Sequence, residues 1–313
     1  MLSGSGAADL LSSLMRLVST LGVQRHILPG VLADPVDDLW FALQERFIAE
    51  APNHFGERGL LATIALSANS MLDETQIEAV IDRASHWPVE GFYIVAQSPS
   101  GYLVDNPVWV SNLLILTSGL KLLRKEVIVG YCNHQSLCLA AANVDAICSG
   151  TWLNVRSFSP NKFFMPGAED VSRRTTWYYC AHTLSEYTLP YMDIAKRQSI
   201  LSEMRCNPEV GSNYANILFS GPNPSSIRWG EGEAFRHYLT CLYSQVAVAQ
   251  KSSYQETFSS YDQMLSIAEA VIRRLHGLGI SGLGRDFRYC IDVNRSALII
   301  FDQARGHQLR RNW

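Results

Sequence analysis

Asn133 and His134, in the segment GYCNHQ, are the residues whose types best fit catalysis. They follow an apolar run, and histidine is the side chain whose charge changes near neutral pH, so it suits general acid–base chemistry. The alternative is that Asn133 only caps a helix that begins near Gln135, with His134 in its first turn. We take His134 and Asn133 as the candidate catalytic residues.

A second segment, CSGTWLNVRSF, has the composition of an anion-binding turn. Its small residues would let backbone N–H groups approach a phosphate, and Arg156 could add two parallel hydrogen bonds. The alternative is a tight turn whose arginine caps neighbouring carbonyl groups. The residues predicted to bind a ligand here are Ser149, Gly150, Thr151, Asn154 and Arg156.

Three further polar residues that follow apolar runs are predicted to contact a ligand. Asn69 and Gln97 offer paired donors and acceptors, which suit the edge of a nucleobase. His182 lies two residues after Cys180, and a Cys–His pair can act as nucleophile and base. However, residues i and i+2 of a strand share a face without touching. Glu186 follows the last apolar run, but no carboxylate pair can be assigned.

Motifs for cofactors and metals are absent from the sequence. No HExxH, GxSxG, P-loop or GxGxxG stands at an expected strand–helix junction. The seven cysteines, at positions 132, 138, 148, 180, 206, 241 and 290, contain no CxxC pair. We therefore expect no metal and no cofactor, and we interpret the cysteines as reduced thiols.

The elements that must position these residues alternate between about residues 27 and 182. Six apolar runs are candidate strands: 26–32, which Pro29 interrupts, then 60–66, 91–97, 126–132, 144–150 and 175–182. They are apolar on both sides, which is typical of a parallel sheet covered by helices. Ligands bind at the carboxyl ends of such strands. Because a complete barrel needs eight strands, we predict a (β/α)-barrel-like α/β fold, incomplete or irregular, with a doubly wound open sheet as second choice.

Helices are expected over 7–21, 73–84 and 107–123. Asp73 can cap the second, with Gln76 as its capping-box partner, and Pro107 suits the first turn of the third. After a loop over 220–232 that is rich in Gly, Pro and Ser, the spacing predicts helices over 234–250, 252–275 and 286–305. We therefore predict a barrel-like domain over 1–221 and a helical C-terminal part over 222–313.

The composition excludes a disordered protein and one with a membrane-spanning helix. The 313 residues include 26 Lys plus Arg and 29 Asp plus Glu, a formal charge of −3, and 47% are hydrophobic. A disordered chain has low hydrophobicity and a high net charge, so this composition excludes a disordered protein. No apolar stretch approaches the roughly 18 residues of a membrane span, and the first residues do not form a secretory signal. We predict a cytoplasmic protein without membrane contact, which assembles as a homo-oligomer or binds a protein partner through its helical part.

Residues 60–158 resemble the barrel of the tRNA-guanine transglycosylases. The resemblance rests on the order LLATIALSANS, WPVEGFYIVAQ and KEVIVGYCNHQSLCLAAANVDAICSGTWLNVRSFS. It implies a (β/α) barrel with transglycosylase-like chemistry on a nucleobase in nucleic acid. The sequence departs from the family at its zinc site, because Cys132, Cys138 and Cys148 are spaced differently. Ser-Ala-Asn at 67–69 and Ser-Gly-Thr at 149–151 stand where its catalytic aspartates would be.

Three functions follow from these patterns. The first is an enzyme, or an enzyme-like binder, of a nucleobase- or phosphate-containing ligand at the barrel mouth. The second is a non-catalytic assembly protein built on a degenerate barrel, since no complete catalytic motif is present. The third, a metabolic barrel enzyme, rests on the fold alone, which does not determine function. We favour the first, with the second as its alternative.

Overall fold

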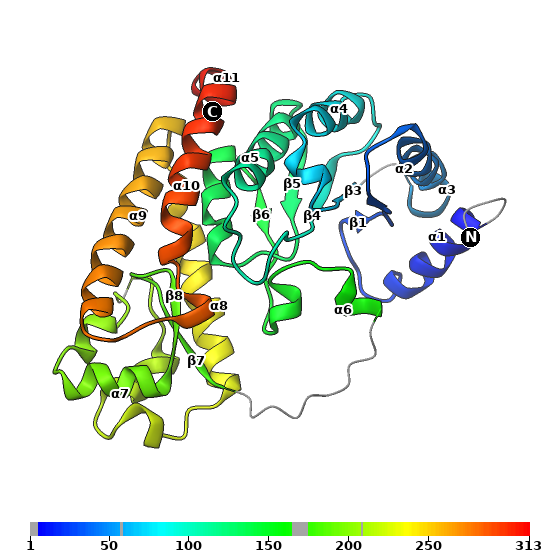
Figure 1. Cartoon of the computed structure of the whole chain (residues 1–313). Helices are drawn as coiled ribbons and strands as arrows, with labels where there is room; N and C mark the ends of the chain where they lie inside the picture. The colour runs from blue at the N-terminus through cyan, green and yellow to red at the C-terminus, as the bar shows by residue number, and fades with distance from the viewer. Residues whose placement is uncertain (1–5, 57–58, 165–174, 208) are drawn as a thin grey trace.

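A parallel sheet that curls into half a barrel forms the centre of the molecule (Figure 1). The computed structural model describes residues 6–56, 59–164, 175–207 and 209–313. In the sheet, β3 (Leu60–Leu66), β4 (Gly91–Ala96), β5 (Glu126–Val129) and β6 (Ala146–Ile147) lie in the order of the chain. The expected α/β fold with a barrel-like sheet is thus confirmed, whereas the described residues do not complete a barrel.

The first strand is split into two pieces, as Pro29 suggested. β1 (His26–Ile27) pairs with the start of β3, and β2 (Leu32–Ala33) pairs with its end. Between them the hydroxyl of Thr63 donates to the carbonyl of Leu28 at 2.5 Å. A Cβ at Gly30 would lie 2.7 Å from the methyl carbon of Thr63, so this close approach requires glycine.

Helices cover the outer side of the sheet. α4 (Glu74–Ala84) and α5 (Pro107–Leu122) pack against each other and the sheet, and α5 is buried along most of its length. α1 (Gly6–Val18), α2 (Asp38–Glu50) and α3 (Pro52–Phe55) form a group near β1 (Figure 1). The helices predicted from 7, 73 and 107 are therefore present.

The last predicted strand forms, but outside the parallel sheet. β7 (Trp177–Cys180) pairs antiparallel with β8 (Ser185–Thr188) in a separate hairpin. The hydroxyl of Thr183 donates to the carbonyl of Cys180 in the turn at 3.1 Å, and Leu184 has a positive φ of 50°. This tight turn reverses the chain before a crossover helix can form, and α7 (Leu189–Arg197) follows the hairpin.

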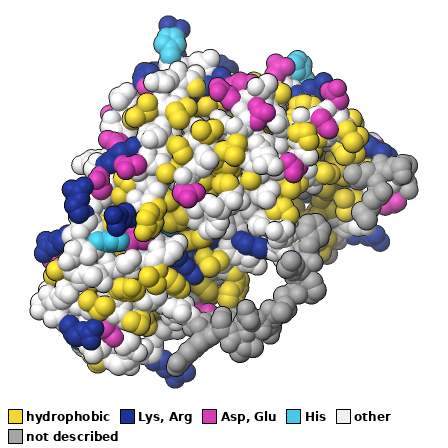
Figure 2. Space-filling view, viewed as in Figure 1, with side chains coloured by type: hydrophobic (Ala, Val, Ile, Leu, Met, Phe, Trp, Pro, Cys, Tyr) yellow, Lys and Arg dark blue, Asp and Glu magenta, His cyan; other side chains and the backbone are white. Residues whose placement is uncertain are grey.

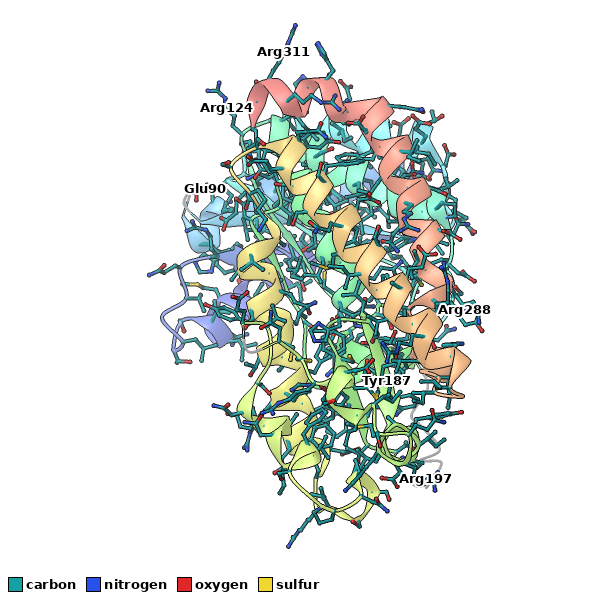
Figure 3. The ribbon with its side chains drawn as sticks, turned by 90° about the vertical axis from the view of Figure 1, so that its left-hand side faces the viewer. Glu90, Arg124, Tyr187, Arg197, Arg288 and Arg311 are labelled. Carbon is teal, nitrogen blue, oxygen red and sulfur yellow. The ribbon has the colours of Figure 1, made fainter. Side chains whose placement is uncertain are left out.

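Four helices close the chain: α8 (Glu231–Ala249), α9 (Tyr254–Gly277), α10 (Arg288–Phe301) and α11 (His307–Asn312). They lie beyond β6, on the side where a complete barrel would continue its sheet (Figure 1). α9 and α10 pack side by side along the molecule, with Arg311 near one end and Arg197 near the other (Figure 3). The helical C-terminal part is confirmed.

Short helical segments connect these elements, and one of them, η2 (His134–Ala142), packs against α5, α8 and α9. The others are η1 (Ser70–Leu72), η3 (Leu153–Val155), α6 (Asn161–Phe164), η4 (Leu201–Met204), η5 (Asn213–Phe219), η6 (Pro224–Ser226), η7 (Leu283–Arg285) and a π-helical turn, Asp302–Gly306.

The buried apolar residues form one cluster that runs from α1 to α11. The core is thus continuous across residue 222, and the domain boundary there stays a prediction. No helix in the described ranges combines the length and the hydropathy of a membrane span.

The sequence predicts that Asp73 caps the helix that begins after it, and this role can be tested directly. Its carboxylate accepts hydrogen bonds from the backbone N–H groups of Thr75 (2.9 Å) and Gln76 (3.3 Å) at the start of α4. We expect Asp73→Ala to lower the free energy of unfolding by about 1 kcal/mol, because two N–H groups lose their acceptor. Urea unfolding measures this. Asp82→Ala, on the exposed face of the same helix, is the control, and an equal loss in both variants would contradict the capping role.

Candidate functional site

A cleft at the carboxyl end of β6 gathers charged and aromatic side chains. It has a volume of about 470 Å³, within the usual range for small-molecule sites. It lies between the segment that follows β6, the β7–β8 hairpin, α8 and the turn before α10. Its lining includes Thr151, Trp152, Leu153, Arg156, Trp177, Glu186, Glu231, Phe235, Tyr238 and Arg285.

Arg156 is buried and holds this region together. Its Nε donates to the carbonyl of Gly150 at 2.7 Å and its Nη2 to the carbonyl of Thr151 at 3.1 Å. Its guanidinium carbon lies 3.5 Å from the ring centroid of Tyr238, a cation–π contact. These contacts match the alternative given for the sequence, in which Arg156 caps neighbouring carbonyl groups. Contact of Arg156 with a ligand stays a prediction.

Glu186 lies opposite Arg156 and is almost completely buried, with 3% of its side chain exposed. One carboxylate oxygen, Oε2, accepts a hydrogen bond from Arg285 at 2.7 Å. The other, Oε1, has no hydrogen-bond partner among the described residues. The Nη1 of Arg156 is 3.8 Å away from it, too far for a hydrogen bond. A buried carboxylate oxygen that faces a charge but accepts no hydrogen bond is uncommon and calls for an explanation.

Arg285 completes the charged part of the cleft. Its guanidinium carbon lies 4.2 Å from the ring centroid of Trp177. The side chain is 17% exposed, so it reaches the surface from the turn that precedes α10. The ion pair between Glu186 and Arg285 thus joins the β7–β8 hairpin to the C-terminal helices.

His134 lies fully inside the protein rather than in the lining of this cleft. The rings of Tyr102, Tyr179, Tyr238 and Phe287 surround it, with centroids 5.0–6.1 Å away. Neither ring nitrogen has a hydrogen-bond partner in the described structure. Burial lowers the pKa of His134 to about 4, so the ring is neutral at physiological pH.

Asn133 caps η2 and also connects the cleft to the sheet. Its Oδ1 accepts from the N–H of Gln135 at 2.8 Å. Its Nδ2 donates to the carbonyls of Tyr102 at 2.9 Å and Arg156 at 3.2 Å. The structure therefore brings Asn133, Gly150, Thr151 and Arg156 into one network, of which Thr151 and Arg156 line the cleft.

The other predicted ligand residues are not in the described lining of the cleft. Asn69 is exposed at the start of η1, and Asn154 is exposed in η3. The side chain of Gln97 accepts from the N–H of Ala68 at 3.3 Å, between the ends of β3 and β4. Ser149 is partly buried, and the ring of His182 lies 2.7 Å from the carbonyl of Arg205.

Sequence reasoning did not connect the residues that build the cleft walls. Trp177, Tyr238 and Arg285 come from three segments that are far apart in the chain. Glu186 was identified only as an acidic residue after the last apolar run. The aromatic residues of the C-terminal helices were visible in the sequence, but their spacing is equally typical of a core.

A second group of residues could hold a metal ion. Cys206, His237 and Cys241 are buried, and their ligand atoms all lie within 4.8 Å of one another. The sulfur of Cys206 lies 3.3 Å from the backbone nitrogen of Ala181 and 3.7 Å from the carbonyl oxygen of Tyr179. His237 and Cys241 are four residues apart on α8, a spacing that places both on one face and could have been noticed in the sequence.

No family model, curated protein or solved structure matches the chain. The resemblance to tRNA-guanine transglycosylases therefore stays a prediction, and function has to be argued from the geometry of the site.

The depressed pKa of His134 predicts a pH dependence of stability. The unfolded histidine has a pKa of about 6.5, so between pH 6.5 and 4 the unfolded chain binds more protons than the folded one. We expect His134 to lower the free energy of unfolding by about 3 kcal/mol as the pH falls across this window. Above pH 6.5 the effect is absent.

Denaturant unfolding at several pH values tests this. His134→Phe fits the aromatic surroundings and should remove this part of the pH dependence. The exposed His86, changed to Gln, is the control and should leave it intact. The same slope in His134→Phe and in the unmodified protein would contradict the prediction.

Proposed function

We propose that the chain binds a planar ring of the nucleobase kind in the cleft that Glu186, Trp177 and Tyr238 line. The observation that carries the proposal is the carboxylate of Glu186. It is buried, it keeps one oxygen without a hydrogen-bond partner among the described residues, and it belongs to the cleft lining. A ligand N–H group that donates to Oε1 would satisfy it once the side chain moves toward the cleft, since Oε1 itself has almost no accessible surface.

The walls of the cleft suit a flat ring. Trp177 and Phe235 contribute aromatic surfaces, and the ring of Phe235 lies 5.1 Å from that of Trp152, centroid to centroid. Tyr238 is 2% exposed and its ring lies against the guanidinium of Arg156, so it closes the wall behind them. Bases bind to such surfaces by stacking, which is worth about 1–3 kcal/mol per base. The volume of about 470 Å³ leaves room for a base and part of a sugar.

The charges in the lining favour a neutral ring over a polyphosphate. The described charged residues of the cleft are two arginines and two glutamates, so their formal charges cancel. The guanidinium of Arg156 already donates to two backbone carbonyls and that of Arg285 to Glu186. The group without a hydrogen-bond partner is an acceptor, so it fits a base with a ring N–H. We choose guanine as the probe because it places two donors, N1–H and N2–H, side by side.

The position of the cleft supports the same proposal. Thr151 and Arg156 follow β6, and parallel sheets bind their ligands at the carboxyl ends of strands. A carboxylate beside a bound base is also the type of group that acts as nucleophile or base in glycosyl transfer. Glu186 is therefore our candidate for transglycosylase-like chemistry, in place of a pair of aspartates.

Glu186→Gln tests the proposal. The variant keeps the shape of the side chain but removes its charge. We expect the affinity for guanine or guanosine to fall by about 10–150-fold, or about 1.5–3 kcal/mol, which is the value of a hydrogen bond to a charged group. Isothermal titration calorimetry measures the affinity, and quenching of tryptophan fluorescence reports stacking near Trp177.

Glu269→Gln is the matched control, because Glu269 pairs with Arg295 at 2.7 Å on the surface of α9. It should leave binding unchanged. Adenosine, which offers a ring acceptor where guanine has N1–H, should bind more weakly than guanosine. Equal binding to Glu186→Gln and the unmodified chain, or no binding of any base, would overturn the proposal.

A second candidate function, assembly through the helical part, rests on exposed apolar residues of α8. Tyr243 is 77% exposed, and Val246, one turn along the same face, is 37% exposed. On the face seen in Figure 2, hydrophobic side chains reach the surface in several groups among charged ones. The proposal is a homo-oligomer whose interface includes this face of α8.

Sedimentation equilibrium tests the assembly. If the α8 face forms the interface, the chain sediments as a dimer or larger species, and Tyr243→Ser shifts it toward the monomer because a buried aromatic contact is lost. Tyr289→Ser, on the exposed surface of α10, should not change the mass. A monomer at every concentration would contradict this function.

A further inference from the structure

We propose that Cys206, His237 and Cys241 form a binding site for a soft divalent metal ion, with Zn²⁺ as the expected ion. Two thiolates and one imidazole are the ligand types that zinc prefers. The three side chains are buried, and their ligand atoms lie within 4.8 Å of one another. This site is separate from the cleft around Glu186 and does not depend on the function proposed for it.

The spacing of the ligand atoms of His237 and Cys241 fits tetrahedral zinc. With Zn–S distances of about 2.3 Å and Zn–N distances of about 2.0–2.1 Å, tetrahedral geometry places sulfur and nitrogen about 3.6 Å apart. The sulfur of Cys241 lies 3.6 Å from Nδ1 of His237 and 3.8 Å from its Nε2. These two ligands need no rearrangement of α8, because residues four apart share one face of the helix.

The hydrogen bonds of His237 identify the ring nitrogen that would bind a metal. Its Nε2 lies 2.8 Å from the carbonyl oxygen of Tyr179, which can only accept, so Nε2 carries the proton. Nδ1 therefore carries the lone pair, and the hydroxyl of Ser212 donates to it at 2.7 Å. A metal ion at Nδ1 would replace this hydrogen bond. A histidine ligand whose second nitrogen donates to a backbone carbonyl is the usual arrangement in metal sites.

One backbone donor faces the sulfur of Cys206, because the N–H of Ala181 donates to it at 3.3 Å. The hydroxyl of Tyr178, 3.4 Å from the sulfur, donates its own proton to the carbonyl of Met204 at 2.8 Å, so it accepts from the thiol. Donors that point at sulfur stabilise its negative charge. Ala181 belongs to the turn of the β7–β8 hairpin, so a metal here would fasten the hairpin to α8.

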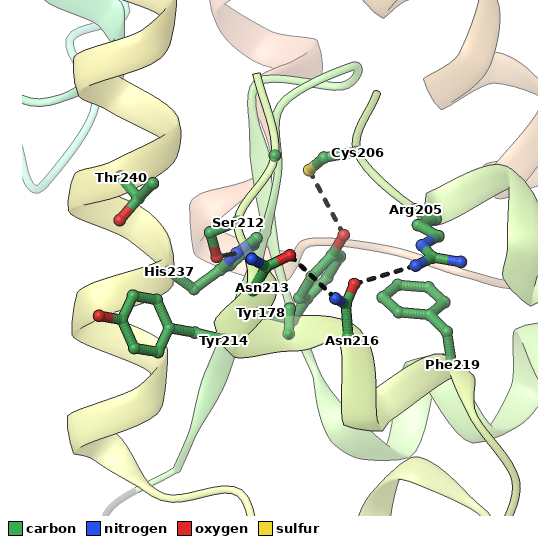
Figure 4. A pocket seen from close by; sticks show the side chains of 12 residues that line it. Tyr178, Arg205, Cys206, Ser212, Asn213, Tyr214, Asn216, Phe219, His237 and Thr240 are labelled. Carbon is green, nitrogen blue, oxygen red and sulfur yellow. Dashed lines mark hydrogen bonds between the residues drawn. The ribbon is translucent and has the colours of Figure 1, made fainter. Parts of the chain in front are cut away.

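The site also has an entry path. Cys206 and His237 line a cavity of about 550 Å³, together with Tyr178, Ser212 and Asn216 (Figure 4). The cavity gives the ion access from solvent and room for a water molecule as fourth ligand. Figure 4 shows His237 on α8 beside Ser212, with Cys206 and Tyr178 joined by their hydrogen bond.

The experiment measures bound metal in the full chain, purified under reducing conditions and then dialysed against a zinc-containing buffer followed by a metal-free one. We expect about one Zn²⁺ per chain by plasma mass spectrometry. In the chelator-treated protein, Co²⁺ should give the sulfur-to-metal charge-transfer bands and the visible bands of a tetrahedral thiolate site. The visible spectrum identifies the geometry without any substitution, so it remains informative if a variant does not fold.

Cys241→Ser and His237→Ala should each weaken Zn²⁺ binding by more than about 100-fold. Loss of a residue that only hydrogen-bonds to a metal ligand typically costs about 10–100-fold, and these variants remove a ligand itself. Cys138→Ser and Cys290→Ser remove buried thiols elsewhere in the core and are the matched controls. The proposal is overturned if the reduced protein takes up no Zn²⁺ and shows no cobalt–thiolate bands. It is also overturned if the controls lose metal as the ligand variants do.

Discussion

The buried guanidinium of Arg156 is the interaction on which the cleft depends. A charge in the interior must be paired and hydrogen-bonded, because otherwise its burial costs several kcal/mol. Arg156 meets this requirement with the carbonyls of Gly150 and Thr151, the ring of Tyr238 and the nearby carboxylate of Glu186. It therefore fixes the end of β6 against α8 and the hairpin. Glu186 then holds Arg285, which brings in the turn before α10.

The incomplete sheet explains why the site is a cleft between unlike elements. In a full barrel, loops from eight strands would surround the ligand. Here the helices after residue 231 lie beyond β6, and the antiparallel hairpin stands where further parallel strands would be expected. The walls of the cleft therefore come from an edge of the half-barrel on one side and from α8 and the hairpin on the other. Aromatic residues of the helical part thereby become part of the site.

Local signals in the sequence predicted much of the fold. Asp73 caps α4 and Pro107 stands in the first turn of α5 as expected, and Pro29 divides the first strand. The hairpin could not be distinguished from a parallel strand, because the centre of its apolar run, 178–181, would be buried in either case. The site was less predictable: the partners of Arg156 and Glu186 lie on segments separated by up to 135 residues, and only the tertiary structure brings them together. Asn133 caps η2, and a polar residue that caps a helix after a strand has the same sequence pattern as a ligand-binding residue at that place.

The most direct test of the central claim is a crystal structure of the full chain soaked with guanosine. The account predicts the base in the cleft, stacked on aromatic side chains, with a ring N–H about 2.7–3.0 Å from Oε1 of Glu186. Density for the base at another surface, or a cleft in which a protein side chain satisfies Glu186 and no base enters, would contradict it.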